Sequence, residues 1–232
     1  MNKTLSALMA AATALALAGT AAAQDAEKPI DLSFNVGAAT DYVFRGVSQT
    51  DRNPQAYAGV DATLWGLGYA GAWASNVNFG NQTDAEYDLY LGVRPTVGPV
   101  TLDLGVVYYG YAGAPSGSDQ DYLEWKAAAS VPAGPAVVGA ALYYSDDFFG
   151  GTGPATYYEV NGSVPLNEKL TLSGAVGHQE VDYDGDYSTW NFGIGYAATD
   201  VLGFDLRYFD TDGHEFGKLY DGRVVLGLKA VF

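Results

Sequence analysis

Charged side chains recur at every second position in several long segments of this 232-residue chain. Residues two apart on an extended strand face the same side, so each series would line one surface. Rings of acidic or basic side chains around a narrow passage select ions by the sign of their charge. The fourteen candidates for such a pore lining are Asp41, Arg45, Asp61, Glu86, Asp88, Arg94, Asp103, Glu124, Lys126, Glu159, Asp205, Arg207, Arg223 and Lys229.

Aromatic side chains share these positions and suggest a second kind of chemistry. Seven tyrosines fall on the same side of their segments as the charges: Tyr57, Tyr90, Tyr109, Tyr111, Tyr122, Tyr143 and Tyr157. Such rings could stack on sugars or aromatic solutes, but tyrosines near strand ends also form the girdle at a membrane surface. We favour the girdle, or space filling beside glycines. We expect Trp73, Trp125 and Trp190 to face outward in the same girdle.

Histidines and serines are the remaining candidates for catalysis. The chain has no Cys and two His, at His178 and His214. A hydrolase needs a nucleophile beside its base. Ser173 precedes His178 by five positions and would therefore face the opposite way. The G-x-S-x-G sequence of many hydrolases is absent. We expect no enzymatic activity, no catalytic residues and no cofactor.

An acidic run, DYDGD at residues 182–186, carries carboxylates of the kind that bind Ca²⁺. It lacks the spaced ligands and the closing Glu of an EF-hand loop. We therefore interpret it as a solvated surface loop and assign no metal ligands.

The elements that would position these side chains are strands of strictly alternating character. In residues 31–45, apolar side chains occupy the even positions from Leu32 to Phe44, and mostly small or polar ones occupy the odd positions. Similar segments recur to the end of the chain. A soluble sandwich would carry Lys and Glu on its polar face, whereas here that face is Gly, Ser, Thr, Tyr and isolated charges, which suits a wet interior. About ten alternating residues are what a membrane-spanning strand needs.

The connections between these segments alternate in length. Five short ones fall at residues 65–67, 95–99, 132–135, 165–169 and 198–201, and six long ones at 46–54, 79–84, 112–121, 145–155, 180–188 and 210–221. Outer-membrane barrels have short periplasmic turns and longer external loops. The pattern predicts an all-β transmembrane antiparallel barrel of about 12 strands, with both termini periplasmic.

A barrel of this size leaves two interpretations of its charged interior. Eight strands enclose a space that side chains fill, whereas about 16 leave an aqueous channel. Twelve lies between these sizes. The charges could line an open pore, which we favour, or could pair into a network that fills the barrel and holds it rigid.

Charge and the first residues indicate where the protein works. Asp and Glu number 27 against 11 Lys and Arg, a net charge of −16, whereas nucleic-acid binding needs clustered Lys and Arg. Fourteen of the 27 acidic residues fall in the six long connections. Residues 1–23 have the basic start, apolar run and small-residue cleavage site of a signal peptide. Residues 24–232 would form a single exported barrel domain.

Several stretches resemble one family. TDYVFRGVSQTD (residues 40–51), WASNVNFG (73–80), YYSDDFFGGTGPATYYE (143–159) and the final GLKAVF are similar to the TorF family of porins. The resemblance implies a β-barrel in the outer membrane and names no solute and no catalytic motif. The terminal Phe232 also resembles the signal that the outer-membrane assembly machinery reads.

The sequence thus favours an outer-membrane, porin-like channel of a Gram-negative bacterium, open to passive diffusion of small hydrophilic solutes. The expected partners are outer-membrane lipid, lipopolysaccharide, the assembly machinery and those solutes, with no nucleic acid. Two alternatives remain open. One is a closed structural or surface-interaction barrel that acts through its acidic loops, and the other is a soluble periplasmic β-sandwich that binds a ligand.

Overall fold

Twelve long strands account for most of the chain in a computed structural model that describes residues 29–182 and 185–232. The signal peptide expected at residues 1–23 lies outside the described residues. The strands are β1 (Ile30–Ala39), β4 (Gln55–Leu64), β5 (Gly68–Asn76), β6 (Ala85–Val93), β8 (Val100–Ala112), β9 (Tyr122–Ala133), β10 (Ala136–Ser145), β11 (Ala155–Pro165), β12 (Leu170–Val181), β13 (Tyr187–Ala197), β14 (Leu202–Thr211) and β15 (Arg223–Val231).

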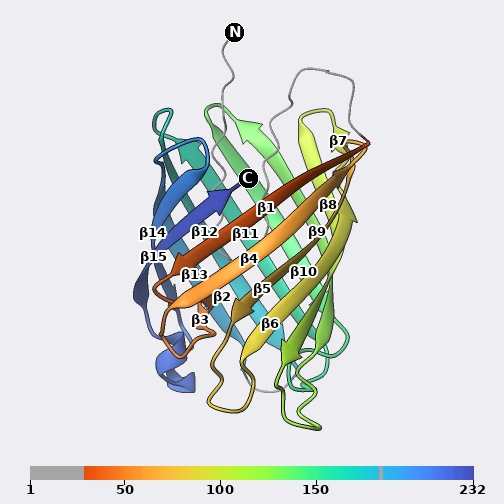
Figure 1. Cartoon of the computed structure of the whole chain (residues 1–232), viewed down its shortest axis with the longest axis vertical. Coiled ribbons are helices and arrows are strands. Elements are labelled where there is room, and N and C mark those ends of the chain that lie inside the picture. The colour runs from red at the N-terminus through yellow and green to blue at the C-terminus, as the bar shows by residue number, and fades with distance from the viewer. Residues whose placement is uncertain (1–28, 183–184) are drawn as a thin grey trace.

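These strands form one closed antiparallel barrel (Figure 1). Each long strand pairs with the next along the chain, and β1 pairs with β15, with Val36 opposite Ala230. Closure leaves no free sheet edge, as a strand-built membrane protein requires. The prediction of an all-β, 12-stranded barrel is confirmed, and the alternative of a two-sheet sandwich is wrong.

The two ends of the barrel differ. The five short connections lie at one end, together with the start of β1 and the end of β15; we call this the turn end. The six longer loops lie at the other, the loop end, at the bottom of Figure 1. Small extra elements lie in these connections: β7 (Thr96–Val97) in a turn, and the 3-10 helices η1 (His214–Phe216) and η2 (Lys218–Tyr220) in the last loop.

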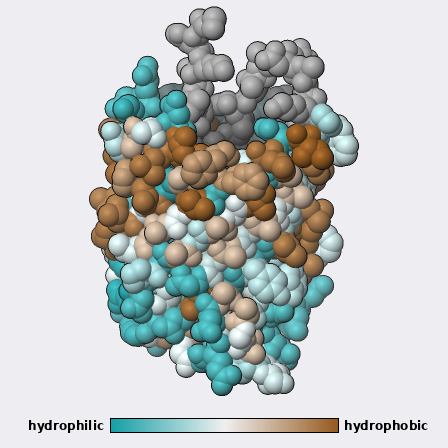
Figure 2. All heavy atoms as spheres, viewed as in Figure 1, coloured by the Kyte–Doolittle hydropathy of each residue, from teal (hydrophilic) through white to brown (hydrophobic). Residues whose placement is uncertain are grey.

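Alternation divides each strand between an apolar outer face and a polar inner one. On β6, Leu89 and Leu91 point outward and are 52 % and 60 % exposed, while Glu86 on the inner side is 2 % exposed. Figure 2 shows the apolar side chains gathered in a band across the barrel wall, with hydrophilic residues covering the loop end. Among the described residues, no helix is long and apolar enough to cross a membrane.

The first strand is shorter than its sequence pattern indicates. The alternation of residues 31–45 predicts a strand to Arg45 with Tyr42 facing outward, but β1 ends at Ala39. Residues 40–54 instead fold into the barrel, where Tyr42 is 3 % exposed and Arg45 is 4 % exposed. The cause is local: the Asp41 carboxylate accepts hydrogen bonds from Ser48 and Thr50, both at 2.7 Å, and these bonds compete with strand pairing.

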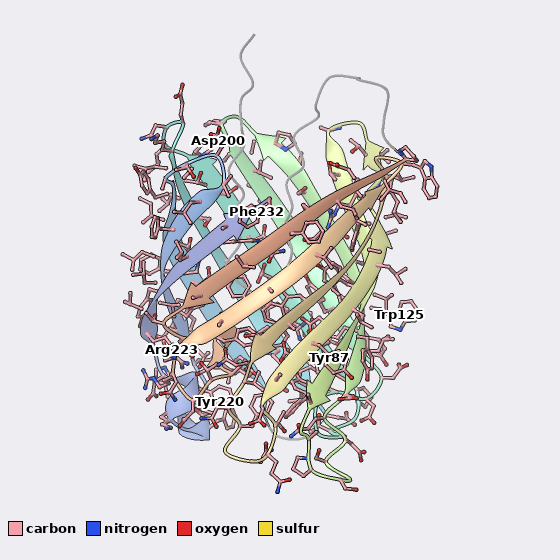
Figure 3. All side chains as sticks on the ribbon, viewed as in Figure 1. Tyr87, Trp125, Asp200, Tyr220, Arg223 and Phe232 are labelled. Atoms are coloured by element: carbon pink, nitrogen blue, oxygen red, sulfur yellow. The ribbon has the colours of Figure 1, made fainter. Side chains whose placement is uncertain are left out.

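One tryptophan faces the opposite way from the expectation. Trp73 shares the inner face of β5 with Tyr69 and Ser75, and in the register it lies opposite Asp88. Its ring packs inside the barrel, 5.4 Å from the centroid of Tyr42. The outward placement of Trp73 is therefore wrong, because strand parity, and not residue type, fixes the side. Trp125, 57 % exposed, does point outward from the wall (Figure 3).

Candidate functional site

All fourteen charged candidates lie buried or half-buried in the structure. Eight are buried: Asp41, Arg45, Glu86, Glu124, Lys126, Glu159, Arg207 and Arg223. Six are half-buried: Asp61, Asp88, Arg94, Asp103, Asp205 and Lys229. Burial of so many charges needs partners, because an isolated charge taken out of water is costly. The contacts sort most of them into three groups.

The first group is built by the loop at residues 40–54, which we call the inserted loop. Within it, β2 (Val43–Phe44) pairs with β3 (Val47–Ser48) to make a miniature hairpin. Arg45 and Gly46 at its tip have φ angles of 47° and 85°. Two successive positive φ angles are typical of a type I′ turn, the tightest connection between antiparallel strands. The turn presents Arg45 to the opposite wall.

Arg45 bridges the inserted loop to four strands, β9 to β12. Its two terminal nitrogens donate to both Glu124 oxygens of β9, at 2.8 Å and 2.6 Å. Nη1 also donates to Gln179 Oε1 of β12 at 2.8 Å. The guanidinium lies 5.0 Å and 4.4 Å from the ring centroids of Tyr143 and Tyr157. The Arg45–Glu124 ion pair is bidentate and is flanked by two aromatic rings, a geometry that is favourable for a buried ion pair.

Two further contacts hold the inserted loop. Arg223 of β15 donates from Nη1 to Asp41 at 3.2 Å. Its place at the loop end is visible in Figure 3. Tyr42 donates its hydroxyl hydrogen to Glu86 at 2.6 Å. These contacts leave the two carboxylates almost fully buried, Glu124 at 1 % and Glu86 at 2 % exposed.

The second group lies nearer the turn end. Asp103 accepts hydrogen bonds from Lys126 Nζ at 2.8 Å, Arg94 Nε at 3.1 Å and the Tyr69 hydroxyl at 2.7 Å. The Arg94 guanidinium lies 3.9 Å from the Tyr69 ring centroid. The Asp103 carboxylate therefore forms ion pairs with two basic side chains, Arg94 and Lys126.

The third group centres on Arg207. Asp205 accepts a hydrogen bond from Arg207 Nε at 3.0 Å. Asn191 and Ser173 each accept one from a terminal nitrogen of Arg207 at 2.7 Å. The alternation places Asn191 on the polar face of its segment, but neither Asn191 nor Ser173 is among the predicted pore-lining residues, because that set contains only charged side chains. Asp61 accepts from the Tyr90 hydroxyl at 2.6 Å, and Glu159 accepts from Tyr157 at 2.9 Å. Lys229 lies on the inner face of β15.

The seven candidate tyrosines face the interior. Tyr57 is half-buried and the other six are 3–8 % exposed. Tyr109 and Tyr122 stack with their centroids 4.5 Å apart, and Phe148 packs on Tyr122 at 4.7 Å. The rings fill space beneath the loops, and none of the seven belongs to an outer girdle.

Neither histidine joins the interior groups. His178 Nδ1 is 3.1 Å from Ser188 Oγ on the next strand, and Ser173 points inward, away from it. His214, in the last loop, contacts Asp210 at 2.8 Å, and this hydrogen bond raises the pKa of His214. In the acidic run, residues 183–184 lie outside the described part, and Asp186 accepts from the amide of Val181 at 2.8 Å.

The closed antiparallel barrel, with its apolar exterior and charged interior, is similar in fold to solved porins. The KdgM porin superposes with a TM-score of 0.63 at 6 % identity, over 86 % of this chain and 99 % of that chain. It is also solved in complex with disordered oligogalacturonate. The NanC porin superposes with a TM-score of 0.58 at 9 % identity, over 87 % and 98 %. At these identities the likeness establishes the fold.

A family model also matches almost the whole chain. Residues 23–230 match the model of Gcw_chp, described as bacterial protein of unknown function, and the chain belongs to this family. None of the curated proteins matches the sequence of this chain. The resemblance to TorF remains a prediction.

Proposed function

We propose that this protein is a porin-like channel of the outer membrane through which small hydrophilic solutes diffuse passively. The observation that carries the proposal is the inverted surface, apolar outside and charged inside, on a closed barrel of twelve strands. An apolar wall suits lipid, and a polar interior suits water and its solutes.

The difference between the two ends of the barrel supports one orientation in the membrane. The acidic loops would face the cell exterior and lipopolysaccharide, and the short turns and both chain termini would face the periplasm. Phe232, 68 % exposed at the turn end, would be accessible to the assembly machinery during insertion. This assignment also fits the TorF resemblance.

The inserted loop makes the passage narrow. Toward the turn end, the half-buried Asp61, Arg94 and Asp205 keep contact with solvent. At the loop end, Arg45, Glu86 and Glu124 are almost fully buried. Solutes would have to pass this layer, so a shift of the inserted loop would control conduction. The loop is held there by side-chain hydrogen bonds that water can replace.

The same layer favours a second candidate function, a closed barrel that acts through its surface loops. If the Arg45–Glu124 layer never opens, the interior is a rigid filling and the acidic loops carry the function.

Single-channel recording in planar bilayers separates the two functions. We expect the native protein to give small steps, and a variant with residues 42–52 replaced by a short Gly–Ser linker to give clearly larger ones. Glu168→Gln, in an exposed turn at the opposite end, should behave as the native protein. Silence from both the native protein and the linker variant, with folding verified by heat-modified gel migration, would rule out the channel.

A further inference from the structure

Three carboxylates lie beneath the inserted loop, and the ion pairs neutralise one of them. Glu124 is bound by Arg45 through both oxygens. Glu86 and Asp88 share the inner face of β6, two residues apart. Neither of them belongs to the ion pairs described above for Arg45, Arg94, Lys126, Arg207 and Arg223. When both are ionised, the layer has an excess of negative charge.

Asp88 also has an oxygen with no partner. Its Oδ1 atom exposes less than 1 Å² and makes no hydrogen bond. Glu86 accepts a hydrogen bond from Tyr42 at 2.6 Å, but a neutral hydroxyl does not cancel its charge. Two adjacent carboxylates away from water require a counter-charge or a proton.

Aromatic rings surround the two carboxylates. In the register Asp88 lies opposite Trp73 on one side and Tyr109 on the other. Tyr42 completes the wall, with its ring 5.4 Å from that of Trp73 and its hydroxyl on Glu86. Aromatic faces attract cations, and organic ammonium ions combine that attraction with apolar contact. No group of three or more His, Cys, Asp or Glu in the described chain is arranged to hold a metal ion, which disfavours a metal here.

We propose that Glu86 and Asp88, walled by Trp73, Tyr42 and Tyr109, bind a small organic ammonium ion inside the barrel. Asp88 Oδ1 supplies the free acceptor for an N–H group, or the anionic contact for a quaternary ion. The inference deepens the proposed function, on which it rests for the route of access, by naming organic cations as a solute class that pauses at the constriction.

Trp73 provides the reporter for the test. The chain has four tryptophans; Trp65 and Trp125 are 68 % and 57 % exposed, and Trp190 lies on the outer face of β13. We expect tetramethylammonium or methylammonium chloride to change the fluorescence of the detergent-folded protein saturably. Sodium chloride at equal ionic strength and uncharged tert-butanol should not, and Trp73→Phe should abolish the response.

Substitution of the free carboxylate identifies the site. Asp88→Asn should weaken ammonium binding at least tenfold, and Glu168→Gln, in the exposed turn at the far end, should leave it unchanged. Absence of a saturable response in the folded native protein would overturn the inference. Equal affinity in Asp88→Asn, or an equal response to sodium, would do the same.

Conductance separates this inference from the channel itself. Steps in bilayers together with no ammonium response would retain the channel and reject the binding site. Ammonium binding in a protein that never conducts would retain the site and reject the channel.

Discussion

Arg45 shows how a single residue can join the inserted loop to the opposite wall of the barrel. It adopts a left-handed backbone conformation that is uncommon for a residue with a side chain, at a cost on the order of 1–3 kcal/mol. The surroundings offset that cost through the two hydrogen bonds to Glu124 and the flanking rings of Tyr143 and Tyr157. Many of the contacts that join the inserted loop to the opposite wall are thus made by one side chain.

A double-mutant cycle tests this dependence. Arg45→Ala leaves the buried Glu124 carboxylate without its counter-charge and should lower the free energy of unfolding by about 3–5 kcal/mol. Glu124→Ala should have a comparable effect, and the double variant should cost less than the two single changes together. Urea titration in lipid or detergent measures all three. The exposed pair of Arg52 and Asp221 is the control, with about 0–1 kcal/mol expected. Strict additivity of the Arg45 and Glu124 changes would contradict the proposal.

His214 gives the last loop a dependence on pH. Its hydrogen bond to Asp210 raises the pKa of His214 above the usual 6.5. Because the folded pKa exceeds the unfolded one, the stabilisation is fully present below pH 6.5 and is lost as the pH rises through the raised value. NMR titration of the labelled histidine should place its midpoint above 6.5, and Asp210→Asn should lower it. A midpoint at or below 6.5 in the native protein would show that the contact does not form.

At the scale of the strand, glycines make room for the interior rings. A side chain on Gly177 would collide with the Tyr157 ring, and one on Gly71 would collide with Tyr90. Each tyrosine therefore lies flat over a glycine of the neighbouring strand. This packing accounts for part of the abundance of Gly and Tyr, which number 30 and 18 in the chain.

Gly177→Ala should displace the Tyr157 ring, and with it one side of the Arg45 contact. We expect a loss of about 1–3 kcal/mol, the usual cost of overpacking. Gly227→Ala is the matched control, since it also faces inward but its nearest neighbour is the Asp205 carbonyl oxygen at 3.9 Å. Equal unfolding midpoints for the two variants would show that the ring does not depend on the glycine.

At the scale of the molecule, the apolar belt distinguishes a lipid-facing wall from a water-facing one. Leu91 is 60 % exposed on the outer face of β6, and Leu166 is 56 % exposed in the turn between β11 and β12. Leu91→Lys should destabilise the protein in bilayers by about 2–4 kcal/mol, and Leu166→Lys by about 0–1 kcal/mol, because the cost of a charge falls toward the membrane surface. Equal effects at the two positions, measured by unfolding in lipid vesicles, would contradict a membrane-embedded belt.

The sequence by itself determined the barrel. Alternation with a period of two is a local property of each segment, so the strands, the inward side of their tyrosines and the alternation of short and long connections could all be predicted. Trp73 escaped prediction because its type suggested a girdle, whereas its position on β5 places it inside.

Only the tertiary structure decided what fills the barrel. Arg45 meets Glu124 and Gln179 at separations of 79 and 134 residues, and Arg223 meets Asp41 at 182. Such contacts arise from closure of the sheet, which brings remote strands to face one another across a narrow space. Alternation in residues 31–45 continues past Ala39, but hydrogen bonds of Asp41 and the positive φ of Arg45 turn the chain inward. The alternation of residues 31–45 is a local pattern, so it could not predict the contacts with Glu124 and Gln179 on the opposite wall that stabilise the inward turn.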